Sequence, residues 1–107
     1  MGELHDWAAR PEREVFPGFH GRFIHSERMT FARWRIDAGA VLPEHSHEHE
    51  QVVHTFAGEL ELVIEGTRHV CGPSSVLVIP PNARHSGRAL TDCVVIDAFA
   101  PVREDYR

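Results

Sequence analysis

Residues 39–58 read GAVLPEHSHEHEQVVHTFAG, and three of their histidines, His45, His47 and His49, stand at alternate positions two residues apart, followed by Gln51. Side chains alternate between the two faces of a strand, so these four share one face if the stretch is extended. Two imidazole nitrogens at this spacing can reach one ion, and neutral imidazole suits nickel, zinc, iron, manganese or copper. A polar surface loop without a ligand is the competing interpretation, and the H-x-H spacing alone does not decide between them.

The composition is that of one ordinary globular domain. A chain of 107 residues is long enough to bury a core without disulfides or structural metals, and 42% of it is hydrophobic against 25% charged. Lys and Arg total 11 against 16 acidic residues, so the net charge is −5. This balance argues against nucleic acid or an anionic membrane as partner, although arginines gathered locally could bind a small anion.

The apolar runs are short. The run SVLVIPP at residues 75–81 is far below the length that spans a bilayer, and no charged-then-apolar leader opens the chain, so we expect a cytoplasmic protein. Cys71 and Cys93 form no CxxC pair, and two isolated cysteines make no disulfide framework. We expect two reduced, half-buried thiols.

Short alternating segments, separated by glycine, proline and asparagine, predict an all-β barrel or sandwich. Little helical period is present apart from a possible turn around residues 6–10. Residues 1–20 are expected to form an N-terminal extension and residues 28–100 the core of a single domain. The expected strands lie within residues 22–37 (two runs), 51–66 (two strands broken near Gly58, with a hairpin tip at Gly66), 75–81 (a short buried strand) and 93–100.

Two glycines and a fourth histidine extend the histidine pattern. Gly39 precedes His45 by six residues, Gly58 follows Gln51 by seven, and PPNARH at residues 80–85 ends in His85. Together these resemble the two motifs of the cupin superfamily, G-x5-H-x-H-x3-E-x6-G and P-x-G-x2-H-x3-N.

The resemblance spans roughly residues 30–100 and departs from the motifs at three positions. Gln51 replaces the glutamate of the first motif, which otherwise fits at every spacing. In the second motif Asn82 stands for the glycine and Ala89 for the final asparagine.

This resemblance implies one cupin domain over residues 1–107, an all-β double-stranded β-helix or jelly-roll barrel with a metal in its mouth. It implies one divalent transition metal per chain (nickel, zinc, iron or manganese). The implied ligands are His45, His47, Gln51 and His85. His49 would support the ligands or face substrate, and Glu50 would point outward or lie at the rim.

Gln51 changes the chemistry expected of such a site. A neutral donor in place of a carboxylate leaves the positive charge of the ion undiminished, so a bound oxygen is polarised more strongly. This favours Lewis-acid or proton-transfer chemistry over oxidation. A vestigial site that binds metal weakly is the alternative.

Asp97 stands out in the segment CVVIDAFAPVREDYR, residues 93–107. On a strand it shares a face with Cys93, Val95 and Phe99, which makes it a carboxylate among apolar side chains. Buried carboxylates are rare unless paired or functional, so Asp97 is either the partner of an arginine or a general acid or base. Arg103 is either a bidentate anchor for a substrate carboxylate or a solvated tail residue.

The stretches HSHEHEQ, HSGRALTDC and DAFAPVREDYR together resemble the small single-domain cupins of the KdgF type, associated with pectin and alginate breakdown. That resemblance implies linearisation and ketonisation of C4–C5 unsaturated uronates, hence an anionic sugar acid as small-molecule partner. It implies Asp97 as the proton-transfer group, Phe99 as a wall against the sugar ring and Arg103 as the carboxylate anchor. A metal-dependent dioxygenase and a non-catalytic sugar-acid-binding cupin remain open as alternatives.

Small cupins commonly dimerise, and two-fold dimers are the commonest closed assemblies, so a homodimer is expected. Met29, Phe31 and Trp34 are candidates for its shared hydrophobic surface or, equally, for the core.

Overall fold

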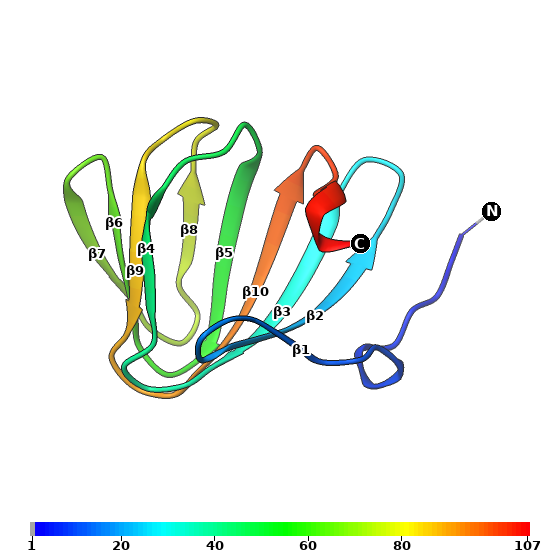
Figure 1. Ribbon diagram of the computed structural model, residues 1–107, viewed down its shortest axis with the longest axis horizontal. Helices are drawn as coiled ribbons and strands as arrows, with labels where there is room; N and C mark the ends of the chain where they lie inside the picture. The colour runs from blue at the N-terminus through cyan, green and yellow to red at the C-terminus, as the bar shows by residue number, and fades with distance from the viewer. Residues whose placement is uncertain (1) are drawn as a thin grey trace.

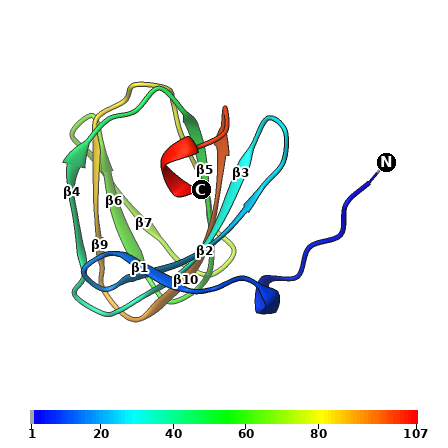
Figure 2. The ribbon, with the colours of Figure 1, turned by 45° about the vertical axis from the view of Figure 1, so that its right-hand side comes forward.

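Two antiparallel sheets face each other in the computed structural model, which describes residues 2–107 (Figures 1 and 2). The six-stranded sheet contains, in spatial order, β1 (Arg13–Phe16), β2 (Phe19–His25), β3 (Thr30–Ile36), β10 (Cys93–Ala100), β5 (Glu50–Ala57) and β8 (Val76–Ile79). The four-stranded sheet contains β4 (Val41–His45), β9 (His85–Ala89), β6 (Leu60–Ile64) and β7 (Thr67–Cys71). The predicted all-β jelly roll is confirmed, as two facing sheets rather than one closed barrel.

The N-terminal residues divide into two parts. The segment before β1 contains the 3-10 helix η1 (Trp7–Ala9), which lies against β2 and matches the turn expected around residues 6–10, and the residues before η1 extend away from the sheets (Figures 1 and 2). Residues 13–20 of the expected extension instead form β1 and the start of β2, at one edge of the six-stranded sheet.

β10 lies in the middle of the six-stranded sheet, between β3 and β5, and every second side chain along it faces the interior. Burial alternates over all eight of its residues, with Asp97 and Phe99 facing inward as predicted. Its pairing with β5 sets Phe99 opposite Gln51 and Asp97 opposite Val53. The register therefore gathers Gln51, Asp97 and Phe99 at one end of the sheet.

The interior is packed with aromatic side chains. Trp34 meets Phe19 and Phe23 edge-to-face, with ring centroids 6.1 and 5.5 Å apart. Because Trp34 is only 4% exposed, it belongs to the core, and its candidacy for a shared surface is wrong. Met29 and Phe31 are 38% and 43% exposed, so both remain candidates for a surface shared between two chains.

Two smaller expectations need correction. β8 is not a buried strand, since Val76 and Val78 are 59% and 54% exposed. The reason is that β8 lies at the edge of its sheet with its outward face uncovered. Cys71 and Cys93 are free, as predicted, but are fully rather than half buried.

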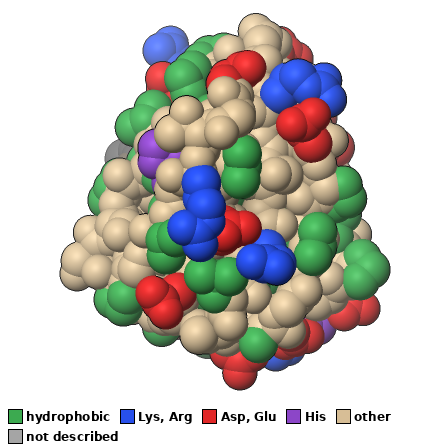
Figure 3. Space-filling model, turned by 90° about the vertical axis from the view of Figure 1, so that its left-hand side faces the viewer, with side chains coloured by type: hydrophobic (Ala, Val, Ile, Leu, Met, Phe, Trp, Pro, Cys, Tyr) green, Lys and Arg blue, Asp and Glu red, His purple; other side chains and the backbone are tan. Residues whose placement is uncertain are grey.

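The outer face of the four-stranded sheet combines charged pairs with exposed apolar side chains such as Val41 and Val70. Arg68 and Arg88 flank Glu61, and Arg84 lies 2.9 Å from Glu44, so basic groups lie beside acidic ones on this face (Figure 3). Such exposed pairs contribute little stability but keep the face solvated. Within residues 2–107, we find no helix of the length and apolarity needed to cross a membrane.

Candidate metal centre and active site

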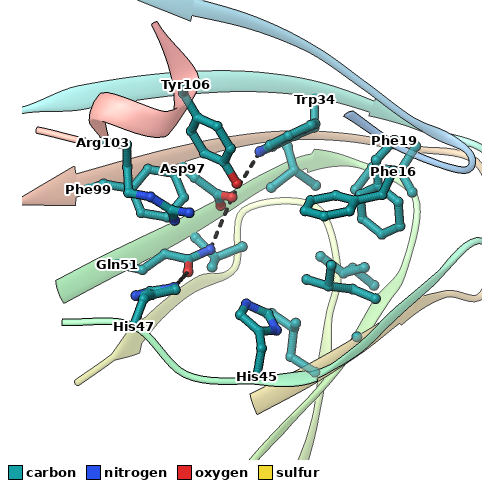
Figure 4. Close-up of a pocket in the computed structure, with 17 residues that line it drawn as sticks. Phe16, Phe19, Trp34, His45, His47, Gln51, Asp97, Phe99, Arg103 and Tyr106 are labelled. Atoms are coloured by element: carbon teal, nitrogen blue, oxygen red, sulfur yellow. Dashed lines mark hydrogen bonds between the residues drawn. The ribbon is translucent and has the colours of Figure 1, made fainter. Parts of the chain in front are cut away.

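A pocket lies between the two sheets, and its lining includes Arg103 and Tyr106 of the C-terminal segment (Figure 4). Figure 4 shows Arg103, Asp97 and Gln51 on one side and Phe16 and Phe19 on the other. The pocket is therefore polar on one side and apolar on the other. Its polar lining is His45, His47, Gln51, Asp97, Arg103 and Tyr106, and its apolar lining includes Phe16, Phe19, Leu42, Leu60, Leu62 and Phe99.

Three of the four histidines predicted as part of the histidine pattern converge on one point. His45 ends β4, His85 begins β9 directly opposite it, and His47 lies in the loop that follows β4. One ring nitrogen from each lies within 4.8 Å of those of the other two. Ligand atoms so close together can share one ion.

Hydrogen bonds to the backbone fix which nitrogen of each ring is free. The Nδ1 atoms of His45, His47 and His85 each lie 2.9 Å from a backbone carbonyl oxygen. A carbonyl only accepts, so each Nδ1 carries the proton and each Nε2 presents a lone pair. The same arrangement orients the histidine ligands of metal sites.

The Nε2 lone pair of His85 lacks a hydrogen-bond donor. This atom is buried and has no hydrogen-bond partner among the described residues. Burial lowers the pKa of both His47 and His85, which favours the neutral imidazoles that bind metals. The group therefore fits a divalent transition metal on the chemistry of its own atoms.

Gln51 points its carbonyl oxygen into this group. Its Nε2 donates to Oδ2 of Asp97 at 3.1 Å, which leaves Oε1 facing Nε2 of His47, also at 3.1 Å. With the His47 proton on Nδ1, these two atoms are both acceptors and repel each other. A cation between them would turn the repulsion into attraction, so Gln51 fits as a fourth donor.

Asp97 is held by one of its two carboxylate oxygens. Oδ2 accepts from Nε1 of Trp34 at 3.0 Å and from Gln51, whereas Oδ1 is buried with no partner in residues 2–107. Burial raises the pKa of Asp97 to about 7. Asp97 is thus not the partner of an arginine, because Trp34 and Gln51 hold it instead.

Arg103 lies at the pocket and is not a solvated tail residue, since its side chain is 12% exposed. Its Nε and Nη2 donate to Oδ1 and Oδ2 of Asp105 at 3.0 and 2.7 Å. The guanidinium carbon lies 4.8 Å from the ring centroid of Phe99 and 4.3 Å from that of Tyr106. A cation is thereby fixed beside the carboxylate and the imidazoles.

Residues 32–99 match the cupin domain family. The chain belongs to the cupin family. The pectin degradation protein KdgF of Dickeya dadantii (strain 3937) is 33% identical to this cupin over 99 residues, covering 90% of each protein.

Solved structures agree with that assignment. The structure of KdgF from a Halomonas species superposes on all of this cupin, and over all of its own chain, with a TM-score of 0.93 and 29% identity. An RmlC-like cupin from Shewanella frigidimarina NCIMB 400 gives 0.92 at 22% identity, covering 100% of this chain and 97% of its own. The second likeness shows the fold alone. The predicted resemblance to small cupins of the KdgF type is confirmed.

The departures from the cupin motifs have physical explanations. Asn82 has a φ of 65°, and asparagine tolerates this left-handed conformation better than most residues, so it can replace the motif glycine. Glu50 is exposed, as expected at a rim. His49 stands outside the three-histidine group and lies, through Nε2, 3.3 Å from the carbonyl oxygen of Val102.

Sequence reasoning missed two residues of the site. Trp34 donates to Asp97 from 63 positions away in the chain, and Tyr106, only 7% exposed, packs against Phe99 and Arg103. A buried polar aromatic usually needs a hydrogen-bond partner, which was the one available signal for Trp34. For Tyr106 the sequence held no comparable signal.

Proposed function

We propose that this cupin linearises and ketonises C4–C5 unsaturated uronates, such as those released from pectin or alginate. The single observation that carries the proposal is Asp97. Its buried, unpartnered Oδ1 belongs to a pocket lined by Arg103 and by His45 and His47, two of the three histidines whose ring nitrogens converge. The names of the relatives from Dickeya dadantii and Halomonas, a pectin degradation protein KdgF and a KdgF, support this choice of substrate class.

The metal would be held by Nε2 of His45, His47 and His85 and by Oε1 of Gln51. When bound, it would supply a Lewis acid that draws electrons from a substrate oxygen. All four donors are uncharged, and the protein adds no anionic ligand to the group.

Asp97 is assigned the proton transfer. Opening the ring releases the proton of a hydroxyl group, and conversion of the resulting enol to a ketone places one proton on carbon, so no redox step occurs. Oδ2 of Asp97 is fixed by Trp34 and Gln51, while Oδ1 is free to take and return that proton. A pKa of about 7 suits a group that must do both near neutral pH.

Arg103 and Phe99 are assigned the orientation of the sugar. The guanidinium would bind the uronate carboxylate through parallel N–H donors. The ring of Phe99, 2% exposed and 5.9 Å from that of His47, would form a flat apolar wall beside the histidine group. Together they would present the enol end of the substrate to Asp97.

The proposal is tested with the metal-loaded protein and the unsaturated monomers derived from galacturonate and mannuronate. Loss of the conjugated enol absorbance should run well ahead of the buffer reaction, stop after chelation and return when metal is restored. Fully loaded protein that accelerates neither sugar would contradict the proposal. Binding of either sugar without turnover would show a sugar-acid-binding cupin instead.

A further inference from the structure

The segment after β10 carries Arg103 across the mouth of the pocket, and several other elements hold it there. The backbone N–H of Arg103 donates to Oγ1 of Thr30 at 2.9 Å. Nη2 of Arg13 donates to the carbonyl oxygen of Tyr106 at 2.6 Å, and His49 reaches the carbonyl of Val102. The backbone on both sides of Arg103 is therefore fixed, and the direction of its long side chain is what remains to be set.

Asp105 sets that direction. Its carboxylate takes two of the five N–H donors of the guanidinium, one on Nε and one on Nη2, in a bidentate pair. The centroids of the Phe99 and Tyr106 rings are 5.8 Å apart, so the guanidinium sits in the angle between them. The other three donors, on Nη1 and Nη2, lie outside this pair, in the plane of the guanidinium, where a ligand carboxylate can meet them.

The negative charge of Asp105 would by itself disfavour an anionic ligand at Arg103. A carboxylate beside Arg103 lowers the positive potential that would attract an anion, so by charge alone it weakens the site. Asp105 itself is on the solvent side, with 58% of its side chain exposed, and Arg103 is among the residues that line the pocket. A geometric role accounts for an acid in this position where an electrostatic one does not.

We propose that Asp105 is a positioning residue: it holds the guanidinium of Arg103 so that its free edge meets the carboxylate of the ligand end-on. The inference rests on the proposed function in that the ligand is a sugar acid. Without Asp105, Arg103 must be ordered anew at each binding event. Immobilising one such side chain corresponds to a loss of about 3- to 10-fold in affinity.

The first measurement needs no ligand. In the NMR spectrum of the metal-loaded protein, the Nε–H group of Arg103 should be rigid, and in Asp105→Asn it should become mobile. Glu104→Gln is the matched control, because Glu104 lies in the same turn and pairs with Arg107 at 2.7 Å instead. An Nε–H equally rigid in Asp105→Asn and wild type overturns the inference.

The second measurement compares galacturonate with galactose by calorimetry. Asp105→Asn should bind galacturonate about 3- to 10-fold more weakly and galactose unchanged, with KM for the unsaturated uronate rising more than kcat falls. In an Arg103→Ala background, the same substitution should have no effect. Unchanged or tighter galacturonate binding in Asp105→Asn overturns the inference, since charge alone predicts tighter binding. Failure of wild type to bind galacturonate, with Arg103 still rigid, counts against the proposed function and not against the Arg103–Asp105 pair.

Discussion

At the scale of single residues, His45, His47 and His85 are oriented in the same way: each donates its Nδ1 proton to a nearby backbone carbonyl and presents the Nε2 lone pair. We therefore predict about one divalent metal per wild-type chain and loss of that metal in His47→Ala. The fold should survive, because His47 lies in a loop outside the strands. Elemental analysis of the purified proteins, with circular dichroism to check folding, measures both.

His54→Ala is the matched control for that prediction. His54 lies on β5 with its ring against Phe56, centroids 4.2 Å apart, away from the pocket. It should keep the full complement of metal. Full occupancy in a His45→Ala/His47→Ala double variant would rule out the ligand assignment.

Gln51 lies between the three-histidine group and Asp97, so Gln51→Glu should have different effects on metal binding and on Asp97. The added carboxylate should keep the metal or bind it more tightly. It also removes the N–H donor to Asp97 and sets a second carboxylate about 3 Å from it, which opposes ionisation of Asp97. We predict retained metal with reduced turnover, measured on one preparation. Loss of the metal would show that Gln51 is not a ligand.

At the scale of elements, the turn between β5 and β6 depends on Gly58. Its φ is 81°, and a Cβ there would lie 2.0 Å from the carbonyl oxygen of Asp92. Gly58→Ala should lower the free energy of unfolding by at least about 2 kcal/mol, the cost of the left-handed conformation plus the clash. Gly66 has the same φ with nothing within 4 Å of the added Cβ, so Gly66→Ala should cost only about 1–2 kcal/mol. Equal losses in urea denaturation would contradict this account.

The sequence predicts the position and the inward face of a strand where the two faces of that strand differ in polarity. Alternation located β10 and the inward side of Asp97, and the cupin spacing located the histidine group. β3 carries bulky side chains on both faces, so periodicity could not decide whether Phe31 or Trp34 faces the core. The bond from Trp34 to Asp97 and the position of Tyr106 over Arg103 depend on contacts between distant segments. No local pattern encodes such contacts.

At the scale of the whole molecule, the outward face of the six-stranded sheet differs from that of the other sheet, where charged pairs lie among the exposed valines. Strand register aligns an unbroken apolar row across five strands: Ile24, Phe31, Ala98, Val52 and Val78. Phe31 and Val78 in this row are exposed and the other three are half-buried, and contiguous apolar surface of this kind marks interaction sites. We predict a homodimer through this face, with a light-scattering mass of twice the 12.1 kDa of one chain.

Two substitutions test whether the dimer forms through the outward face of the six-stranded sheet. Phe31→Arg should give monomers, whereas Val70→Arg, on the four-stranded sheet and also 43% exposed, should leave the dimer intact. A monomeric wild type, or a Phe31→Arg dimer, would contradict the prediction.

Turnover of unsaturated galacturonate in Asp97→Asn, with metal content measured in the same sample, tests whether Asp97 transfers the proton beside the metal. Asparagine keeps the shape and can still accept from Trp34, but it cannot take a proton at neutral pH. We predict full metal and a kcat reduced by about 10²–10⁴-fold, the usual contribution of a general acid–base group. An Asp97→Asn protein that is fully metallated and as active as wild type would contradict the account.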